Sequence, residues 1–428
     1  MTSPAPAAPR AAPTEDRLSP LVFGAIVLAA VVLLAATVGW ALPVVVLAVL
    51  FMVMFHEFGH YITAKRAGLL VTDFFVGFGP IVWSTTVGET RYGVRALPLG
   101  GYVKVPGMTW SDPVDPSIES RTYRHSSYPK RVLFAAAGSL MHFVLALVIA
   151  WAALAFIGVP SASHVGVTAL STFQGQRETP AQRAGLEVGD RIVSVDGRSI
   201  TSATTLARLI HRSAGVPLTL VVERGGRRLT LHATPVNGQH VEVNGQTLDT
   251  SSRPEGFLGI EVGALSVRAS ILGAVPRAAG ELGAIAVASV KGLAHVFTPH
   301  EFASLYHQVT SPAAAQNRQN QLNRPESIVG VVRIAVQGAR YGVGTLLTIL
   351  MAVNVFVGVF NLFPMLPLDG GYIAIATYER LRSRRGRTYH ADVNRLLPVI
   401  YAFVTVLGVL FAATLYLDIV HPIANPFG

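Results

Sequence analysis

Two histidines and a glutamate carry the strongest chemical signal in this sequence. His56, Glu57 and His60 form an HExxH pattern inside a long apolar stretch. Residues four apart lie on one face of a helix, so His56 and His60 can direct ring nitrogens at one metal ion. Glu57, beside that face, is placed to deprotonate an attacking water. Ionisable groups inside an apolar helix are costly and usually functional. We therefore prefer a metal site to the alternative, in which structural side chains merely reach for the membrane surface.

Two histidines leave a third protein ligand to be found. Glu89 lies far enough downstream to serve, but it stands in a polar turn. We favour Asp369, which follows a long apolar run and is flanked by Pro367 and Gly370. Helix breakers at this depth are tolerated only where the freed backbone lines a cavity enclosed by protein. An aspartate that only caps the next helix is the alternative.

The composition indicates a membrane protein. Of the 428 residues, 51% are hydrophobic and 14% are charged, whereas a soluble domain carries about 25% charged residues. The formal net charge of +10 is typical of basic cytoplasmic loops, so we expect the lipid bilayer and no nucleic acid as a partner. The sequence has no cysteine, which excludes disulfides, iron–sulfur clusters, thiolate metal sites and a cysteine nucleophile. Any metal must be held by histidines and carboxylates.

About five apolar segments are long enough to cross a bilayer. They are residues 20–38, 43–64, 132–157, 344–365 and 396–417. The first could instead be a signal peptide, although the region before it is long and contains acidic residues. Residues 268–297 are interrupted by a proline and charged residues, so we expect a surface or interfacial helix there. The polar segment 300–327 is expected to be a linker, and 327–338 a further membrane-surface helix.

Basic residues set the expected orientation. They gather in three places, namely 65–66, 121–131 and 380–387, which all fall on one side of the membrane under this assignment. Short loops rich in Lys and Arg remain in the cytoplasm. The N-terminus is then cytoplasmic, and the segment 158–343 lies on the opposite, extracytoplasmic face.

Residues 69–105, between the second and third apolar segments, are expected to form a β-hairpin. An apolar run is followed by a turn at 87–90 and by alternating apolar and polar residues at 91–97, the pattern of a strand with one wet face. Gly100 and Gly101 stand near the end of the second strand. A soluble hairpin that caps the protein is the alternative to one associated with the membrane.

Residues 165–263 are much less apolar and resemble bacterial PDZ domains. The resemblance rests on AGLxxGDxI at 184–192 and VDG at 195–197. It implies a groove helix at 204–212 and a loop whose backbone amides receive a chain end. That loop comprises Phe257, Leu258, Gly259 and Ile260. Two roles are open to the domain, namely binding of a chain end and exclusion of large substrates.

HEFGH in an early span, together with NLFPMLPLDGG at 361–371, resembles the site-2 protease family of intramembrane zinc metalloproteases. The closest branch is the bacterial regulator-of-sigma-E protease type with one PDZ domain, and the resemblance covers about 43–420. It implies Zn²⁺ bound by His56, His60 and Asp369, with Glu57 as the catalytic base. The same resemblance implies a hairpin that dips into the membrane and offers its free edge to an unwound substrate. The residues that would shape the substrate cleft are Asn361, Pro364, Gly100, Gly101 and His142.

One motif departs from the family. Its AGPxxN run reads Ala137 to His142 here, with Ser139 in place of the proline and His142 in place of the asparagine. We interpret His142 as a hydrogen-bonded helix histidine that replaces the amide. A contact to the substrate and an alternative metal ligand are the other interpretations.

The resemblance implies a hydrolase of the bacterial inner or plasma membrane that acts in regulated intramembrane proteolysis. Its substrates would be single-span membrane proteins, such as the anti-sigma factors of sigma factor regulation, after a first cut outside the membrane. A membrane metalloprotease for misfolded proteins or signal-peptide remnants is one alternative. An inactive PDZ scaffold and a transporter with a midplane ion site are others; the scaffold would lack a catalytic residue, and the transporter leaves the HExxH spacing unexplained.

We therefore expect a polytopic α-helical membrane protein with about five transmembrane helices, a membrane-associated β-hairpin and an extracytoplasmic PDZ domain of the α+β class. The expected organisation is a disordered tail at 1–18, three spans with the hairpin at 19–157, the PDZ domain at 165–263, interfacial helices and a linker at 264–340, and two spans at 341–428.

Overall fold

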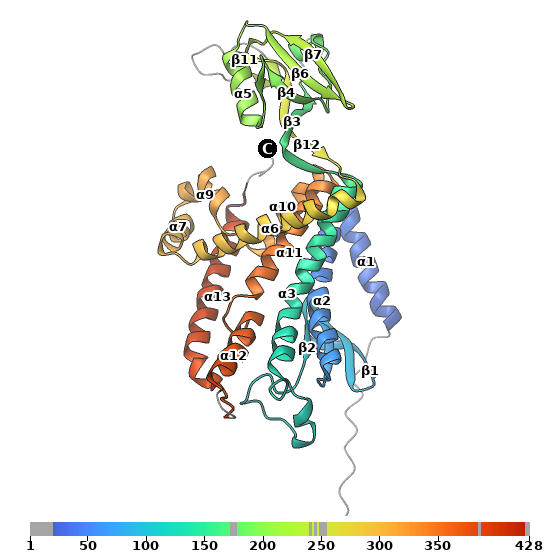
Figure 1. Ribbon diagram of the computed structural model, residues 1–428, viewed down its shortest axis with the longest axis vertical. Coiled ribbons are helices and arrows are strands. Elements are labelled where there is room, and N and C mark those ends of the chain that lie inside the picture. Colours follow the sequence, from blue (N-terminus) through green and yellow to red (C-terminus); the bar gives the residue numbers. More distant parts are fainter. Residues whose placement is uncertain are drawn as a thin grey trace, which may run out of the picture. The chain divides into compact units, whose positions relative to one another are not determined.

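The computed structural model describes residues 20–171, 178–238, 242–243, 246–247, 255–383 and 387–423. The tail at 1–18, expected to be disordered, lies outside these ranges. The chain divides into two compact units (Figure 1). The helical unit comprises 1–148, 281–341 and 349–428, and the sheet unit comprises 149–280 and 342–348.

Long apolar helices make up most of the helical unit. They are α1 (Pro20–Val38), α2 (Ala41–Ala67), α3 (Tyr128–Ala152), α11 (Val343–Asn361), α12 (Asp369–Arg382) and α13 (Leu397–Val420), and α3 continues through a π-helical turn at Ala153–Ile157. The end of α2 follows from its sequence. Gly68 takes the left-handed conformation with φ +79°, and Lys65 and Arg66 lie in the last turn, where positive charge is favourable.

Five of the described helices are long and apolar enough to cross a membrane, which makes this a multi-pass membrane protein. Four of them, α2, α3 with its π-helical turn, α11 and α13, correspond to predicted spans. The described apolar part of α1, Gly24–Val38, is shorter. The fifth is α6 (Ile271–Val296), expected to be interfacial, which is continuous through Pro276. The part of α6 within the helical unit, 281–296, runs across the direction of α13 in Figure 1, as an interfacial helix would.

The polar segment 300–327 is helical and differs from the expected linker. Its three helices are α7 (Pro299–Thr310), α8 (Pro312–Gln316) and α9 (Arg318–Asn323). Each begins behind a polar residue whose side chain accepts a backbone N–H of the first turn, namely Thr298, Ser311 and Asn317. Such N-caps, two of them followed by proline, stabilise helix starts regardless of overall polarity. The helix predicted at 327–338 is α10 (Ile328–Arg340), capped by Ser327.

The predicted hairpin is present as β1 (Asp73–Val87) and β2 (Thr90–Lys104), which pair antiparallel. The register is irregular, because residues 73–76 pair with 101–104 and also with 91–94. Among the described strands, 101–104 pair with β1 alone and so form one border of this small sheet. Two 3-10 helices, η1 (Pro116–Arg121) and η4 (Val393–Leu396), complete the connections of the helical unit.

The sheet unit is built on a sheet of strand order β12-β3-β4-β6-β7, with β5 paired to β4. Its strands are β3 (Val159–Leu170), β4 (Arg191–Val195), β5 (Arg198–Ser199), β6 (Leu218–Arg224), β7 (Arg227–Ala233) and β12 (Ile260–Val267). Short pairs join β8 (Val236–Asn237) to β11 (Gly256–Phe257), and β9 (Glu242–Val243) to β10 (Gln246–Thr247). The helices α4 (Pro180–Arg183) and α5 (Ala203–Arg212) accompany the sheet, and Leu206 of α5 is buried in its core with Leu220 and Val222.

A buried ion pair fixes the end of α13 in the helical unit. Arg324 donates to Asp418 Oδ1 over 2.9 Å, and the two side chains are 0% and 1% exposed. The second carboxylate oxygen of Asp418 accepts the backbone N–H of Ser327 at the start of α10. One carboxylate therefore joins α9, α10 and α13.

Asp418→Ala should lower the free energy of unfolding by about 3–5 kcal/mol, because it leaves the buried Arg324 charge without its partner. Thermal unfolding in detergent micelles measures the loss. Arg395→Ala is the control, because its ion pair with Asp392 is exposed and such pairs contribute little. Equal effects of the two substitutions would contradict this assignment.

Candidate metal centre

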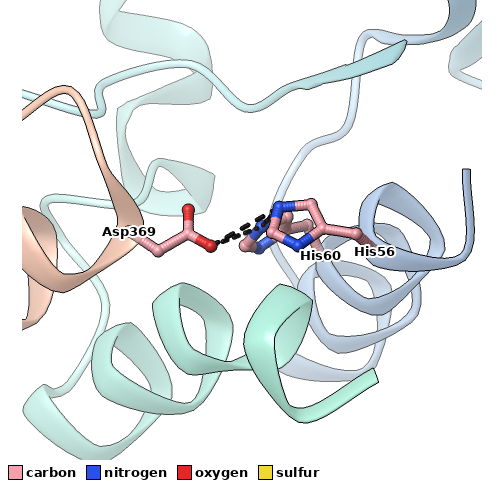
Figure 2. Close-up of side chains that lie close together, drawn as sticks. All are labelled: His56, His60 and Asp369. Atoms are coloured by element: carbon pink, nitrogen blue, oxygen red, sulfur yellow. Dashed lines mark hydrogen bonds and ion pairs between the residues drawn. The ribbon is translucent and has the colours of Figure 1, made fainter. Parts of the chain in front are cut away.

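Three potential ligand atoms converge between α2 and the start of α12. His56 Nε2 and His60 Nε2 are 3.2 Å apart. The Oδ2 atom of Asp369 lies 3.5 Å from the former and 3.3 Å from the latter. Figure 2 shows both imidazole rings turned toward the Asp369 carboxylate. The structure thus brings together all three predicted metal ligands.

The separations fit a zinc ion. Zinc in proteins is commonly tetrahedral, with bonds of about 2.0–2.2 Å to histidine nitrogen and carboxylate oxygen, which places neighbouring ligand atoms about 3.3–3.6 Å apart. The observed distances of 3.2, 3.3 and 3.5 Å match this spacing. Two imidazoles and one carboxylate are also a ligand set typical of catalytic zinc, which leaves a fourth position open.

Hydrogen bonding around these groups leaves the ligand atoms available. His60 Nδ1 lies 2.9 Å from the carbonyl oxygen of Phe134 on α3. Donation to this carbonyl requires the tautomer whose Nε2 lone pair is free for a metal. Asp369 Oδ2 is buried and has no hydrogen-bond partner within the described ranges. A buried acceptor without a partner is costly, and a cation would satisfy it.

Glycines allow the surrounding elements to approach the two histidines. A Cβ at Gly59 of α2 would lie 2.6 Å from the Met141 side chain and 2.7 Å from the carbonyl oxygen of Ala137, both on α3. A Cβ at Gly138 of α3 would overlap the ring of His56. Sequence reasoning did not assign Phe134 or Gly138 to the site, although the Ala-Gly pair at 137–138 is a signal of close helix packing.

Asp369 is the first residue of α12 and not its cap. The N-cap position is taken by Leu368, which makes no side-chain cap bond, so the alternative of a capping aspartate does not describe this structure. The preceding loop folds tightly against the helix, because a Cβ at Gly371 would lie 2.5 Å from the backbone nitrogen of Leu366. Asn361 ends α11, and Pro364 lies in this loop.

The border of the β-hairpin lies beside Glu57. A Cβ at Gly101 would come within 3.2 Å of Glu57 Cγ and 2.8 Å of Met54 Sδ. The backbone of Val103 hydrogen-bonds to Glu57. Gly100 faces the other way, with φ +143° and its α-carbon packed against Phe78. Of the two glycines predicted for the cleft, Gly101 is therefore the one next to the base.

His142 is hydrogen-bonded within the helix bundle. Its Nδ1 lies 3.0 Å from Oδ1 of Asn354, whose Nδ2 donates to the carbonyl oxygen of Leu350. The His142 ring centroid is 5.1 Å from that of His56, and His142 is outside the group of three converging ligands. This geometry supports the interpretation as a hydrogen-bonded helix histidine. Asn354 was not predicted, since an isolated asparagine in an apolar segment identifies no partner.

Glu89 is engaged elsewhere. Its carboxylate accepts from Arg121 and from Lys65, with ion-pair distances of 2.8 Å to each. Hydrogen bonds from Arg121 and Lys65 lower the pKa of Glu89 to about 2. It does not belong to the converging group, so the alternative third ligand is not supported.

The predicted peptide-binding loop lies beside a groove of the sheet unit. The groove has a volume of about 440 Å³ and lies between α5 and the start of β12. Phe257, Leu258 and Ile260 line it, and Gly259 takes φ +84° within the same loop. The groove and the metal centre are treated separately, because they belong to different units.

Comparison with known proteins identifies the chain's relatives. The model of "Peptidase family M50" matches residues 44–407. The chain is 32% identical over 399 residues to the zinc metalloprotease Rip1 of Mycobacterium tuberculosis (strain H37Rv), which covers 88% of this chain and 96% of the relative. Rip1 of Mycolicibacterium smegmatis is 30% identical over 407 residues, covering 88% and 97%. A putative zinc metalloprotease of Clostridium perfringens, CPE1693, is 29% identical over 374 residues, covering 87% and 96%.

These matches extend over most of the chain and include both segments that form the metal centre. The protein is a membrane zinc metalloprotease and belongs to peptidase family M50.

Proposed function

We propose that this protein hydrolyses peptide bonds within the membrane, with zinc bound by His56, His60 and Asp369 and with Glu57 as the general base. The observation that carries the proposal is the convergence of the three ligand atoms within 3.5 Å of one another. Two of them come from α2, a helix apolar and long enough to span the membrane.

In this mechanism a bound zinc ion supplies Lewis acidity, which activates water and polarises the scissile carbonyl. Glu57 accepts the proton of the attacking water and then delivers it to the leaving amine. The carbonyl of Phe134 keeps His60 in the tautomer that ligation requires. Asn354 holds His142 beside His56, where it replaces the asparagine amide of the related motif.

The hairpin border would present the substrate. A helical peptide buries its carbonyl groups in hydrogen bonds, so cleavage needs an extended segment. An extended chain can pair with a strand that has an unused side. Residues 101–104 form such a border, and Gly101 and Val103 lie against Glu57. We infer that the scissile segment adds to this strand, with Asn361 and Pro364 shaping the opposite side of the cleft.

The proposed substrates are single-span membrane proteins, with anti-sigma factors as the expected class, cut after a first cleavage outside the membrane. The support is the resemblance to the regulator-of-sigma-E type. Cleavage of misfolded proteins or signal-peptide remnants would use the same site and is the second candidate. An inactive scaffold is disfavoured, because the base and the complete ligand set are present.

We further propose that the protein lies in a bacterial cell membrane with its N-terminus in the cytoplasm. The basic loops at 65–66, 121–131 and 380–387 support this orientation. The sheet unit would then be extracytoplasmic.

We assign residues 165–263 as a PDZ domain. The groove between α5 and the loop at 256–260 supports this assignment, because PDZ domains bind extended chain ends beside a helix. The domain would act by excluding untrimmed substrates or by binding a chain end through Phe257, Leu258, Gly259 and Ile260.

Glu57→Gln should retain zinc and lose cleavage by about a thousand-fold or more, because only the proton acceptor is removed. The measurements are zinc content by atomic emission and cleavage of a reporter substrate in proteoliposomes. The same variant should retain bound substrate in a pull-down. Cleavage at the wild-type rate would contradict the mechanism.

Asp369→Ala should lower zinc occupancy as strongly as His60→Ala, because three protein ligands are the minimum of a catalytic zinc site. Glu89→Ala is the control, since its carboxylate is held by Lys65 and Arg121, and it should keep its zinc. Full zinc in the Asp369→Ala protein would place the third ligand elsewhere, with His142 as the next residue to test.

Removal of the proposed PDZ domain should leave the zinc site intact and admit untrimmed substrates. The register offers a clean junction, because Val165 pairs with Ala264 across β3 and β12. Residues 166–263 can be replaced there by an Asn-Gly turn, which suits antiparallel strands.

The measurement is cleavage of full-length against trimmed substrate in matched membranes, with zinc content as the folding control. Gain of full-length cleavage supports exclusion of large substrates. A deletion protein that keeps zinc, cuts the trimmed substrate and still refuses the full-length one would rule this role out.

A further inference from the structure

A buried ion pair joins α3 to α12 outside the metal centre. Arg131 Nη1 donates to Glu379 Oε2 over 2.7 Å, and the two side chains are 11% and 5% exposed. Glu379 follows Asp369 by ten residues on α12, a rise of about 15 Å. The pair is therefore too far along the helix to touch the metal itself.

One face of α12 connects this ion pair to the metal centre. It carries, at three- and four-residue spacing, Asp369, Tyr372, Ala376 and Glu379. Ala376 and Glu379 are buried, and the ring of Tyr372 meets that of Tyr123 edge-on, with centroids 6.2 Å apart. The face that presents the proposed ligand at one end is thus held by the ion pair at the other.

The partner helix α3 carries the contacts that orient both histidines. The Phe134 carbonyl bonds to His60, and Gly138 leaves space for the ring of His56. Both residues follow Arg131 within two turns of α3. The ion pair therefore ties the helix that orients the histidines to the helix that begins with Asp369.

Both charges are held in defined surroundings. Glu379 Oε1 accepts the backbone N–H of Ala391 over 2.8 Å, so the carboxylate also anchors the chain after α12. The Arg131 guanidinium lies 5.1 Å from the ring centroid of Tyr123, a residue that is 1% exposed. A second polar contact between the helices, from Tyr128 to Thr377, is 3.3 Å long. Displacement of α12 by one turn would break all of these contacts.

We propose that Arg131 and Glu379 are positioning residues that fix the register of α12 against α3, and thereby the place of Asp369 relative to the two histidines. Apolar contacts such as those of Ala376 change little when helices slide. A buried ion pair cannot slide without leaving two charges unpaired in an apolar interior. Selection of one register is the best-attested use of buried polar groups. The inference rests on the proposed function only in taking Asp369 as a ligand.

The test compares zinc affinity with stability for the full-length protein in detergent micelles. Arg131→Met with Glu379→Met replaces both charges by flexible apolar side chains, so no unpaired charge is left. The matched control is Arg324→Met with Asp418→Met, which removes the buried ion pair at the end of α13. Zinc dissociation constants come from competition with a chromophoric chelator, and thermal unfolding of the metal-free proteins reports stability.

We expect the Arg131/Glu379 double variant to bind zinc about 10–100-fold more weakly, as when residues that orient metal ligands are replaced. Its unfolding midpoint should stay close to that of the wild type. The control variant should bind zinc as the wild type does, which would exclude a general effect of losing a buried ion pair.

Zinc affinity within about three-fold of the wild type in the folded Arg131/Glu379 variant would overturn the proposal. If that variant does not fold, Glu379→Asp decides instead, because it keeps the charge and shortens its reach by one methylene. Weaker zinc binding by Glu379→Asp supports positioning, and unchanged binding overturns it. Asp369→Ala is measured in parallel, since wild-type zinc affinity there would refute the proposed ligand set, whatever the ion-pair variants do.

Discussion

The structure depends on one constraint, namely that two imidazole nitrogens and one carboxylate oxygen meet within 3.5 Å among apolar helices. Polar atoms buried without partners are costly, and Asp369 Oδ2 has no hydrogen-bond partner among the described residues. A bound cation converts this cost into affinity. The helices around the site must therefore exclude water while they keep the ligand spacing, and their sequences reflect that requirement.

Small residues allow this arrangement. Between membrane helices lipid is as apolar as a leucine side chain, so close backbone approach and hydrogen bonds determine how they associate. Gly59 and Gly138 bring α2 and α3 together around His56, and Gly101 brings the hairpin border to Glu57. A single methyl group at any of these three positions would separate parts that the chemistry needs in contact. The same economy of space explains why Gly371 follows Asp369 so closely where α12 turns away from its loop.

Much of the site could be predicted because its signals are local. The HExxH spacing lies within one helical turn, and the breakers around Asp369 mark an interruption that only a cavity tolerates. The bonds from His60 to Phe134 and from His142 to Asn354 could not be predicted, since each joins residues more than seventy positions apart. The helices at 299–323 illustrate another limit. Their capping residues were present in the sequence, but polarity alone was taken as evidence for a linker. The direction of α6 likewise depends on neighbours that its own composition does not specify.

The ligands on α2 and the ligand on α12 are separated by about 300 residues of chain. At a synthesis rate of roughly 5–20 residues per second, α2 emerges from the ribosome about 15–60 s before Asp369 does. During that interval a helix with two histidines and a glutamate must reside in the bilayer with an incomplete ligand set. Metal loading and the onset of proteolytic activity are therefore late events of biogenesis, and a chain truncated before α12 remains harmless to its neighbours in the membrane.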